Sequence, residues 1–200
     1  MRLILASNNK NKLCEFRQLV EGMDIELLSQ SEAGLQLDVE ETGTTFEENA
    51  YLKAKAVTDA LGCAAVADDS GLVVDALNGE PGIYSARYGP GHDASDADRY
   101  NYLLNKLGEE KNRSARFVCC ICCTMPDGTV LRARGECEGE IMYGPKGSGG
   151  FGYDPVFKPD AVDCGMAELT ADEKNAISHR GKALRAFAGE LKRYYNGDNK

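Results

Sequence analysis

The chain has 200 residues, 42% of them hydrophobic, so it can bury a core of its own and lies at the upper end of the usual size of one domain. Its formal charge of −9 argues against nucleic acid as a partner, because binding to nucleic-acid phosphates needs a basic surface. No run of about 18 apolar residues could cross a membrane, and the N-terminal apolar segment is too short for a signal peptide. We therefore expect one domain, in the cytoplasm, with no membrane partner.

The chain is predicted to begin with a strand over residues 2–6, a polar loop over residues 7–11 and a helix with apolar residues at helical spacing. The start of such a helix attracts anions, because its N–H groups are unpaired and the helix dipole is positive there. Lys12 adds a positive charge at this point. A capped helix start with exposed lysines explains the same residues equally well, because the glycines of a Walker A loop are missing.

A second helix is predicted to begin after Thr45, because Thr45 and Glu48 fit a capping box and Gly62 is placed to end the helix. Glu48 then needs only to stabilise the start of this helix. Glu40 and Glu41 lie before the cap and have no such role. They are therefore candidates for a metal ligand that faces an acidic residue elsewhere in the chain.

Two adjacent carboxylates, Asp68 and Asp69, follow an apolar run over residues 63–67 that is predicted to be a buried strand. Charge so close to a core needs a partner. Mg²⁺ is a suitable one, because it binds one or two carboxylates together with substrate phosphates. A solvated turn, with Ser70 and Gly71 supplying the turn geometry, is an alternative of equal weight.

The middle of the chain contains a loop, a helix and a hairpin. Residues 78–91 are rich in glycine and proline and are predicted to be a long structured loop, and residues 93–108 are predicted to be a helix. Residues 116–125 and 129–136 flank a Pro-Asp-Gly turn, which predicts a β-hairpin.

The first strand of this hairpin contains Cys119, Cys120, Cys122 and Cys123, which form two overlapping C-x-x-C pairs. Such pairs can bind zinc, but side chains alternate along a strand, so four thiols could not converge on one metal. We interpret these cysteines as small buried hydrophobic residues of a protein in a reducing compartment.

A glycine-dense segment over residues 144–157 carries Phe151 and Tyr153, followed by Asp154. Backbone freedom and flat aromatic surface suit a loop that wraps around a ring and presents a carboxylate. A flexible hairpin loop is the alternative. We favour binding, because an exposed phenylalanine in a mobile loop would be costly to leave in water.

The last helical segments are predicted to begin at Thr170 and after Ser178. His179 opens the final helix, and one interpretation is that it is an ordinary capping or surface histidine. Arg180 follows, and its rigid donors favour carbonyl or phosphate oxygens.

Six segments of the chain, in this order, resemble the inosine triphosphate pyrophosphatase family, whose members clear deaminated purine nucleoside triphosphates. The resemblance covers essentially the whole chain, although no single segment is decisive. It implies that residues 1–200 form a single two-lobed mixed α/β domain, usually a homodimer, with a long central sheet and a nucleotide cleft between the lobes. The segments are residues 7–12, 45–50, 67–72, 79–87, 151–155 and 178–181.

The resemblance also implies roles for individual residues. Asp69 is the catalytic residue and a metal ligand, and Glu40 occupies the place of the second acidic metal ligand. The first loop grips the triphosphate, and the later segments hold the base and the ribose. The residues implied to bind substrate are Ser7, Asn8, Asn9, Lys10, Asn11, Lys12, Lys53, Ser70, Phe151, Gly152, Tyr153, Asp154, Lys174, His179 and Arg180.

The expected reaction is the Mg²⁺-dependent hydrolysis of inosine, deoxyinosine and xanthosine triphosphates to the monophosphate and pyrophosphate. Mg²⁺ would neutralise the developing charge while Asp69 orients or deprotonates a water for attack at the α-phosphorus. Donors on Arg180 or Lys174 would pair with a 6-oxo purine and confront the amino group of adenine. A catalytically silent nucleotide-binding regulatory module, or a pyrophosphatase for modified pyrimidine nucleotides, stays open as an alternative.

Overall fold

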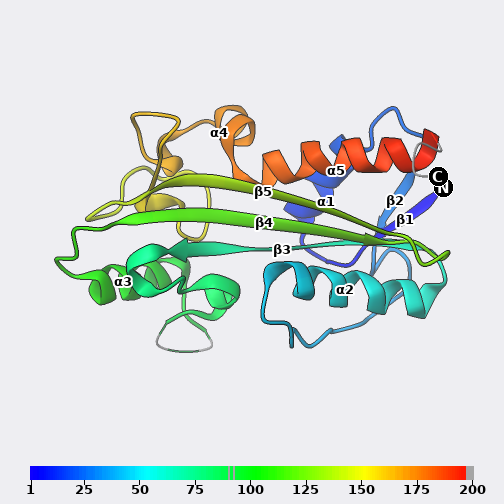
Figure 1. The fold of residues 1–200 in the computed structure, drawn as a ribbon, viewed down its shortest axis with the longest axis horizontal. Helices are drawn as coiled ribbons and strands as arrows, with labels where there is room; N and C mark the ends of the chain where they lie inside the picture. Colours follow the sequence, from blue (N-terminus) through cyan, green and yellow to red (C-terminus); the bar gives the residue numbers. More distant parts are fainter. Residues whose placement is uncertain (90, 92, 197–200) are drawn as a thin grey trace. The chain divides into compact units, whose positions relative to one another are not determined.

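The computed structural model describes residues 1–89, 91 and 93–196, and it has a mixed α/β architecture built on a six-stranded sheet (Figure 1). The strands are β1 (Arg2–Leu5), β2 (Glu26–Ser29), β3 (Ala64–Val74), β4 (Ser114–Thr124), β5 (Val130–Ile141) and β6 (Phe157–Pro159). The α-helices are α1 (Lys10–Leu19), α2 (Phe46–Leu61), α3 (Asp96–Leu107), α4 (Ala171–Ile177) and α5 (His179–Asn196).

The sheet has the strand order β2-β1-β3-β4-β5-β6. Strand β1 pairs in parallel with β2 and with β3, whereas β6 runs antiparallel to β5, so the sheet is mixed. Strands β3, β4 and β5 have 11, 11 and 12 residues. The α/β class and the long sheet expected from the resemblance are therefore confirmed.

The chain divides into two compact units. Unit 1 contains Met1–Asp69, Cys119–Gly135 and Ala183–Lys200, and unit 2 contains Ser70–Val118 and Glu136–Lys182. The boundaries fall within β3, β4, β5 and α5.

Unit 1 has hydrophobic side chains on both faces of its strands, because neighbouring residues of a strand point in opposite directions. Leu5 and Val66 pack on one face with Phe16 of α1 and Phe187 of α5, whose ring centroids lie 6.3 Å apart. On the other face, Ile4 and Ala65 pack with Val57 of α2. Helices α1 and α5 thus cover one face of these strands and α2 covers the other (Figure 1).

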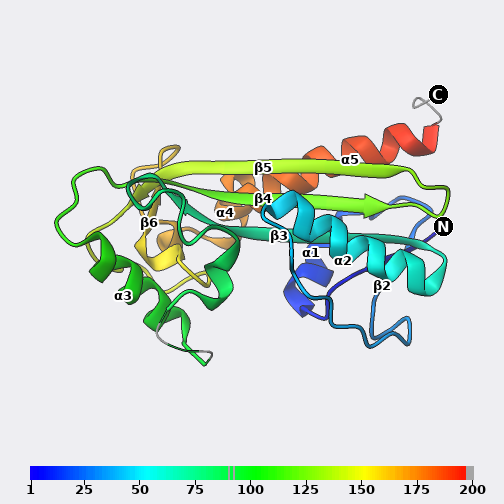
Figure 2. The ribbon, with the colours of Figure 1, turned by 60° about the horizontal axis from the view of Figure 1, so that its bottom comes forward.

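Unit 2 has a core of its own, in which α3 and β6 take part (Figure 2). Leu103 of α3 lies in one cluster with Phe117 and Phe157, whose rings meet edge to face at 4.7 Å. The ring of Tyr153 belongs to the same cluster and is only 4% exposed. The loop that carries Tyr153 is therefore anchored in the core of this unit.

The two ends of α2 and the hairpin turn that local patterns predicted are confirmed. Thr45 and Glu48 form a capping box at the start of α2, and Gly62 ends this helix with a left-handed backbone, φ +64°. The Pro-Asp-Gly turn joins β4 and β5 as predicted, and the N–H of Met125 donates to the carbonyl of Thr129 at 2.8 Å.

The prediction for Asp68 and Asp69 was wrong in one respect, since neither a strand end nor a solvated turn occurs there. Strand β3 continues through both carboxylates to Val74, and both side chains are buried. The physical reason is that lysines from other elements neutralise them inside the sheet, as described below.

The cysteines of β4 are buried, as predicted. Cys119 and Cys123 face the core of unit 1 together with Ile121. No disulfide forms among the described residues, which include all eight cysteines.

Within residues 1–89, 91 and 93–196, no helix is both long enough and apolar enough to span a membrane.

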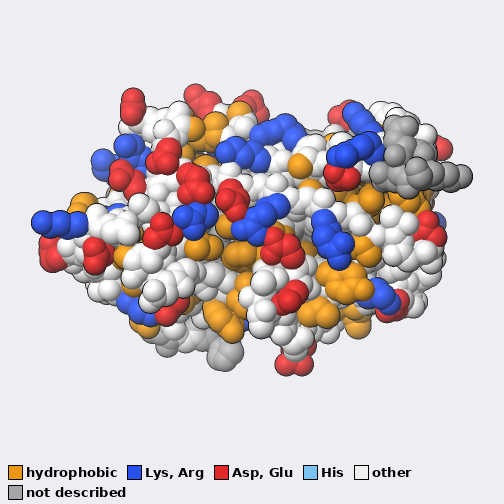
Figure 3. Space-filling view, viewed as in Figure 1, with side chains coloured by type: hydrophobic (Ala, Val, Ile, Leu, Met, Phe, Trp, Pro, Cys, Tyr) orange, Lys and Arg blue, Asp and Glu red, His pale blue; other side chains and the backbone are white. Residues whose placement is uncertain are grey.

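The charged side chains of the described residues are mixed on the face that Figure 3 shows. Lysine and arginine side chains lie among aspartates and glutamates there, rather than in one continuous basic area.

Candidate functional site

The catalytic candidate Asp69 lies in unit 1 within a group that we name the carboxylate cluster: Glu41, Asn49, Lys53 and Asp69. The ammonium of Lys53 donates to Asp69 Oδ1 at 3.2 Å and to Glu41 Oε1 at 2.8 Å. Asn49 Nδ2 donates to Asp69 Oδ2 at 3.4 Å. One lysine thus lies between two carboxylates.

Local structure explains how these side chains meet. Asn49 and Lys53 are four residues apart on α2 and so share one face of the helix. That face lies against the side of β3 to which Asp69 points, the same side as Ala65. Glu41 comes from the extended segment that precedes α2.

Asn49 also fixes the segment that carries Glu41. Its amide oxygen accepts a hydrogen bond from the N–H of Gly43 at 2.9 Å, and the residue is fully buried. A Cβ on Gly43 would lie 2.6 Å from this oxygen, so glycine is required for the approach. Asn49 therefore connects the Glu41 segment with Asp69.

Burial and neighbouring charges act in opposite directions on the cluster. Burial raises the pKa of Asp69, and this outweighs the lowering by the charge of Lys53. Burial alone would lower the pKa of Lys53, but Asp69 and Glu41 outweigh it and raise this pKa. Lys53 therefore keeps its proton and its positive charge at neutral pH. The carboxylate beside it, Asp69, accepts a proton more readily than an exposed aspartate does.

Asp68 points to the opposite face of β3 from Asp69, since the two residues are adjacent in a strand. Its Oδ1 lies 2.7 Å from the ammonium of Lys12, a residue of α1. The side chain of Asp68 is 2% exposed and that of Lys12 is 21% exposed. The two aspartates therefore do not form one chelating pair, and each has its own lysine.

The loop before α1 is held by its own polar side chains. Ser7 Oγ accepts from the N–H of Asn9 at 3.1 Å, and Asn9 Oδ1 accepts from the N–H of Lys12 at 3.3 Å. Asn8 Oδ1 accepts from the N–H and the hydroxyl of Ser31. The side chains of Lys10 and Asn11, also predicted to bind substrate, lie outside the described part of the structure.

The structure distinguishes two adjacent glutamates, of which the resemblance implied Glu40 as the metal ligand. Glu41 contacts Lys53 with a side chain that is 25% exposed, whereas Glu40 is an exposed residue. Glu41, rather than Glu40, is thus the acid brought beside Lys53 and Asp69. Sequence reasoning also missed Asn49, although its spacing of one helical turn from Lys53 was a usable signal.

A second group of predicted residues meets in unit 2, and we name it the aromatic cluster: Phe151, Asp154, Lys174 and Arg180. The ring of Phe151 is 52% exposed, with Lys174 Nζ 4.5 Å and Arg180 Cζ 5.4 Å from its centroid. Asp154 is buried, and its Oδ2 accepts from Lys174 Nζ at 2.5 Å and from the N–H of Phe151 at 2.8 Å. The cluster offers a half-exposed aromatic ring with two cations close to it.

Other predicted residues of unit 2 support this cluster. The hydroxyl of Tyr153 donates to the carbonyl of Ser85 at 2.9 Å, so its ring anchors the loop from within the core. His179 is 8% exposed and stacks on Phe117 with a centroid distance of 4.8 Å. Ser178 Oγ accepts from the N–H of Gly181, which caps α5 as predicted.

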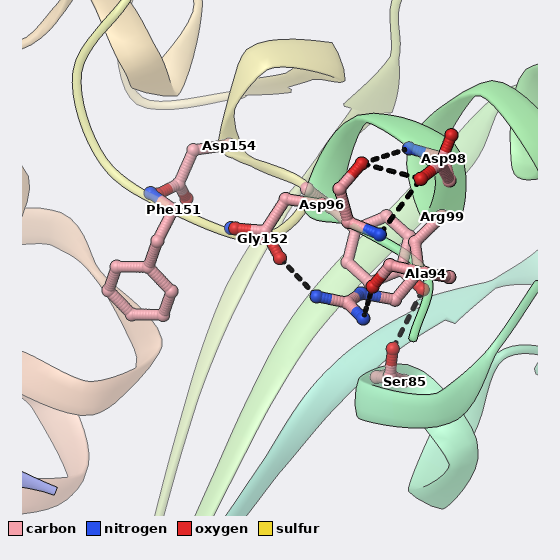
Figure 4. Close-up of polar contacts among 10 residues, drawn as sticks. Ser85, Ala94, Asp96, Asp98, Arg99, Phe151, Gly152 and Asp154 are labelled. Atoms are coloured by element: carbon pink, nitrogen blue, oxygen red, sulfur yellow. Dashed lines mark hydrogen bonds and ion pairs between the residues drawn. The ribbon is translucent and has the colours of Figure 1, made fainter. Parts of the chain in front are cut away.

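Two further positions complete the predicted set. Gly152 has a left-handed backbone, φ +63°, and its N–H donates to Asp96 Oδ2 at 2.6 Å (Figure 4). Ser70 follows Asp69 in β3 as the first residue of unit 2 and is partly buried. Asp96 was not among the predicted residues.

Comparison with known proteins agrees with these observations. A family model described as the Ham1 family matches residues 3–190. A protein of Nostoc sp. named dITP/XTP pyrophosphatase is 50% identical over 190 residues, which cover 94% of this chain and 93% of that protein. A protein of Exiguobacterium sp. with the same name is 46% identical over 98% of this chain and 100% of its own length.

Solved structures give the same result. The Staphylococcus aureus Ham1 protein superimposes with a TM-score of 0.92 at 45% identity, covering 97% of this chain and 100% of that chain. A HAM1 protein from Coxiella burnetii also has a TM-score of 0.92, at 42% identity over 96% of this chain and 99% of its own. As the six sequence segments predicted, the chain is a member of this family, the Ham1 family.

Proposed function

We propose that this chain is a nucleoside triphosphate pyrophosphatase that hydrolyses inosine, deoxyinosine and xanthosine triphosphates to the monophosphate and pyrophosphate. Such an enzyme would remove deaminated purines from the nucleotide pool. Membership of the Ham1 family and the names of the bacterial relatives support this proposal. The observation that carries it is the buried carboxylate Asp69 in contact with the ammonium of Lys53, an acid and a cation suited to phosphate chemistry.

The donor chemistry of the carboxylate cluster fits Mg²⁺. Asp69 and Glu41 both contact one cation, the ammonium of Lys53. Their oxygens therefore lie close enough together to bind a metal cation as well. Within the described residues, no group of three or more acidic, cysteine or histidine side chains could hold a metal ion alone. Mg²⁺ commonly uses one or two carboxylates and completes its coordination with water and substrate phosphates.

We therefore propose that Asp69 and Glu41 would hold Mg²⁺ when substrate is present. The ion would neutralise charge that develops on the phosphates. Glu41 would take this role in place of Glu40, the acid named from the resemblance, because it is the carboxylate of Glu41 that contacts Lys53 beside Asp69.

The residues of the chain would perform the proton transfer and the positioning. Asp69 would accept a proton from the water that attacks the α-phosphorus, and its raised pKa makes it a better base near neutral pH. Lys53 and Lys12 would supply positive charge to the phosphate tail, together with the positive end of the α1 dipole.

The aromatic cluster would bind the purine. Phe151 offers a half-exposed ring for stacking, and Lys174 and Arg180 lie over that ring as hydrogen-bond donors. A 6-oxo group would accept from such donors, whereas the amino group of adenine would confront them. Each mismatch of this kind costs about 1–3 kcal/mol.

We also propose that the protein is a homodimer and lies in the cytoplasm, as the resemblance implies. The absence of a membrane-spanning helix among the described residues is compatible with that location. Light scattering of the purified protein at micromolar concentration tests the dimer, since a monomer mass would contradict it.

Pyrophosphate release from a panel of nucleotides tests the proposed function. The purified protein is incubated with inosine, xanthosine, adenosine, guanosine and deoxycytidine triphosphates, with Mg²⁺ and with a chelator. We expect pyrophosphate from the inosine and xanthosine substrates, in the presence of Mg²⁺ only. Binding without turnover would indicate a regulatory module, and stepwise release of single phosphates would contradict attack at the α-phosphorus.

A further inference from the structure

The backbone beside Phe151 is held by two carboxylates from different parts of unit 2. The N–H of Phe151 donates to Asp154 Oδ2 at 2.8 Å, and the next N–H, that of Gly152, donates to Asp96 Oδ2 at 2.6 Å. Asp154 lies three residues after Phe151 in the sequence. Asp96 lies 56 residues before Gly152, at the start of α3. Figure 4 shows the Asp96 side chain beside Gly152, with the Phe151 ring pointing away from α3.

Asp96 is itself held in place. Arg99 forms an ion pair with Asp96 Oδ1 and donates to the carbonyl of Ala94 at 2.5 Å. The two oxygens of Asp96 thus have different partners, and Oδ2 is the one that meets Gly152. Burial alone would raise the pKa of Asp96, but the hydrogen bonds from Gly152 and Arg99 outweigh it and lower this pKa. The carboxylate is therefore charged at neutral pH.

Capping of α3 does not depend on Asp96. The helix begins with a capping box between Ser95 and Asp98, in which Asp98 accepts from the N–H and the hydroxyl of Ser95 (Figure 4). Asp98 thus caps α3, while the side chain of Asp96 accepts a hydrogen bond from the loop that carries Phe151.

Although Tyr153 anchors this loop in the core, the backbone of Phe151 itself needs a further contact, because the residues on both sides of Phe151 are glycines with left-handed backbones. Gly150 has φ +74° and Gly152 has φ +63°. Glycine moves readily between conformations, so a loop of this composition does not by itself fix the direction of the ring between them.

We propose that Asp96 is a positioning residue that sets the Phe151 ring for stacking on the purine, and so contributes to base specificity. It acts through Gly152. This inference rests on the proposed function, because it takes Phe151 to contact the base. A base that stacks on a displaced ring loses contact area and alignment with the donors over that ring.

Two alanine variants of α3 test the proposal, measured against wild type by calorimetric titration with inosine monophosphate and with inorganic pyrophosphate. Asp96→Ala removes the Gly152 contact, and the control Asp98→Ala removes a first-turn carboxylate of the same helix without touching the loop. We expect Asp96→Ala to weaken inosine monophosphate about tenfold, as for a charge-assisted hydrogen bond, with pyrophosphate affinity unchanged. Asp98→Ala should change neither affinity, and Asp96→Asn, which keeps an acceptor oxygen, should lose less than Asp96→Ala.

Amide hydrogen exchange at Gly152 separates this proposal from the proposed function. Exchange should become faster in Asp96→Ala and stay unchanged in Asp98→Ala, with or without nucleotide. Unchanged exchange at Gly152, or equal loss of inosine monophosphate affinity in both alanine variants, would overturn the role of Asp96. A wild-type protein that binds no inosine monophosphate would instead overturn the proposed function, and the specificity role with it.

Discussion

Asp69 is a buried carboxylate that accepts a proton more readily than an exposed aspartate does. It is 9% exposed, and burial raises its pKa despite the ammonium of Lys53 at 3.2 Å. Water-exposed aspartates are poor bases at neutral pH, because their pKa lies far below it. The same burial that makes Asp69 a better base also makes its charge costly to the folded state.

Asp69→Asn should remove catalysis and leave binding largely intact, because asparagine has the shape of aspartate but accepts no proton. We expect kcat to fall roughly a hundredfold to ten-thousandfold, the usual contribution of a general base. Pyrophosphate release gives kcat, and calorimetric titration with inosine triphosphate gives affinity. Turnover at the wild-type rate would contradict the role assigned to Asp69.

The same variant should be more stable than wild type at neutral pH without divalent ions. An acid whose pKa is raised by folding holds its proton more tightly in the folded chain. Its contribution to the free energy of unfolding therefore decreases as the pH rises from its ordinary pKa of 3.8 through the folded pKa. Thermal unfolding in a chelator should show a higher Tm for Asp69→Asn at pH 7, and no gain near pH 3.

The control for this stability effect is Asp59→Asn on α2. Asp59 pairs with Lys55, and its side chain is 60% exposed. Its replacement should give no gain in Tm at pH 7, since little burial cost is relieved. An equal gain in both variants would indicate a general effect of net charge.

Asn49 has no reacting atom, yet its removal should impair both folding and catalysis. Asn49→Ala would leave the Gly43 N–H without its acceptor, at a cost of about 1–3 kcal/mol for an unsatisfied group, and would release Asp69 Oδ2. We expect kcat to fall by about tenfold or more, as positioning losses do. Urea unfolding and pyrophosphate release measure the two effects, with Lys55→Ala on the surface of α2 as the control.

At the scale of elements, helices α2, α3 and α4 begin with the same capping motif. Capping boxes join Thr45 to Glu48, Ser95 to Asp98 and Thr170 to Glu173 at the starts of α2, α3 and α4. Each box involves residues three positions apart, so it depends on little beyond the local chain.

Glu48→Gln should destabilise the protein in a pH-dependent way. Hydrogen bonds from the N–H and the hydroxyl of Thr44 are the main cause of the lowered pKa of Glu48. An acid with a lowered pKa contributes stability above its ordinary value of 4.5 and loses it as the pH falls through the folded pKa. Urea unfolding should therefore show a deficit at pH 6 that shrinks toward pH 3, whereas a constant deficit would contradict this explanation.

The elements also show what could be predicted from the sequence. The capping box of α2, the hairpin turn and the burial of the β4 cysteines follow from patterns within a few residues, and these predictions are confirmed. The continuation of β3 through Asp68 and Asp69 could not be predicted in this way, because their partners Lys12 and Lys53 come from other elements.

For the site, too, contacts between distant parts of the chain could not be predicted from the sequence. Adjacent residues such as Glu40 and Glu41 have nearly the same local sequence, and the acid that meets Lys53 depends on how the segment before α2 packs, for example through the hydrogen bond from Gly43 to Asn49. The contact of Asp96 with Gly152 spans 56 residues and gives no local signal.

At the scale of the whole molecule, the cysteines offer a test of the packing of both units. Cys14 is exposed, Cys63 and Cys164 are partly buried, and the other five are buried. Burial raises the pKa of Cys122 to about 11, which suppresses the reactive thiolate. Ellman's reagent should label Cys14 quickly, Cys63 and Cys164 slowly, and the rest only on unfolding. Rapid labelling of more than three thiols in the native protein would contradict this packing.

The fold as a whole was predicted by resemblance and not by periodicity. Helical and strand spacing gives the elements one at a time, but the order of strands in a sheet depends on contacts between distant segments. The six matching segments carried that information, and the superposition on the Staphylococcus aureus protein at a TM-score of 0.92 agrees with it.

The two-sided anchoring of the Phe151 loop has a thermodynamic consequence. A loop that is already ordered in the free protein loses little conformational entropy when a ligand arrives, since its ordering is completed during folding. Association of a purine with the half-exposed ring should then combine a negative heat-capacity change, from the apolar surface it covers, with only a small entropic penalty. Preorganisation of this kind would let a small nucleotide bind tightly without closure of a lid.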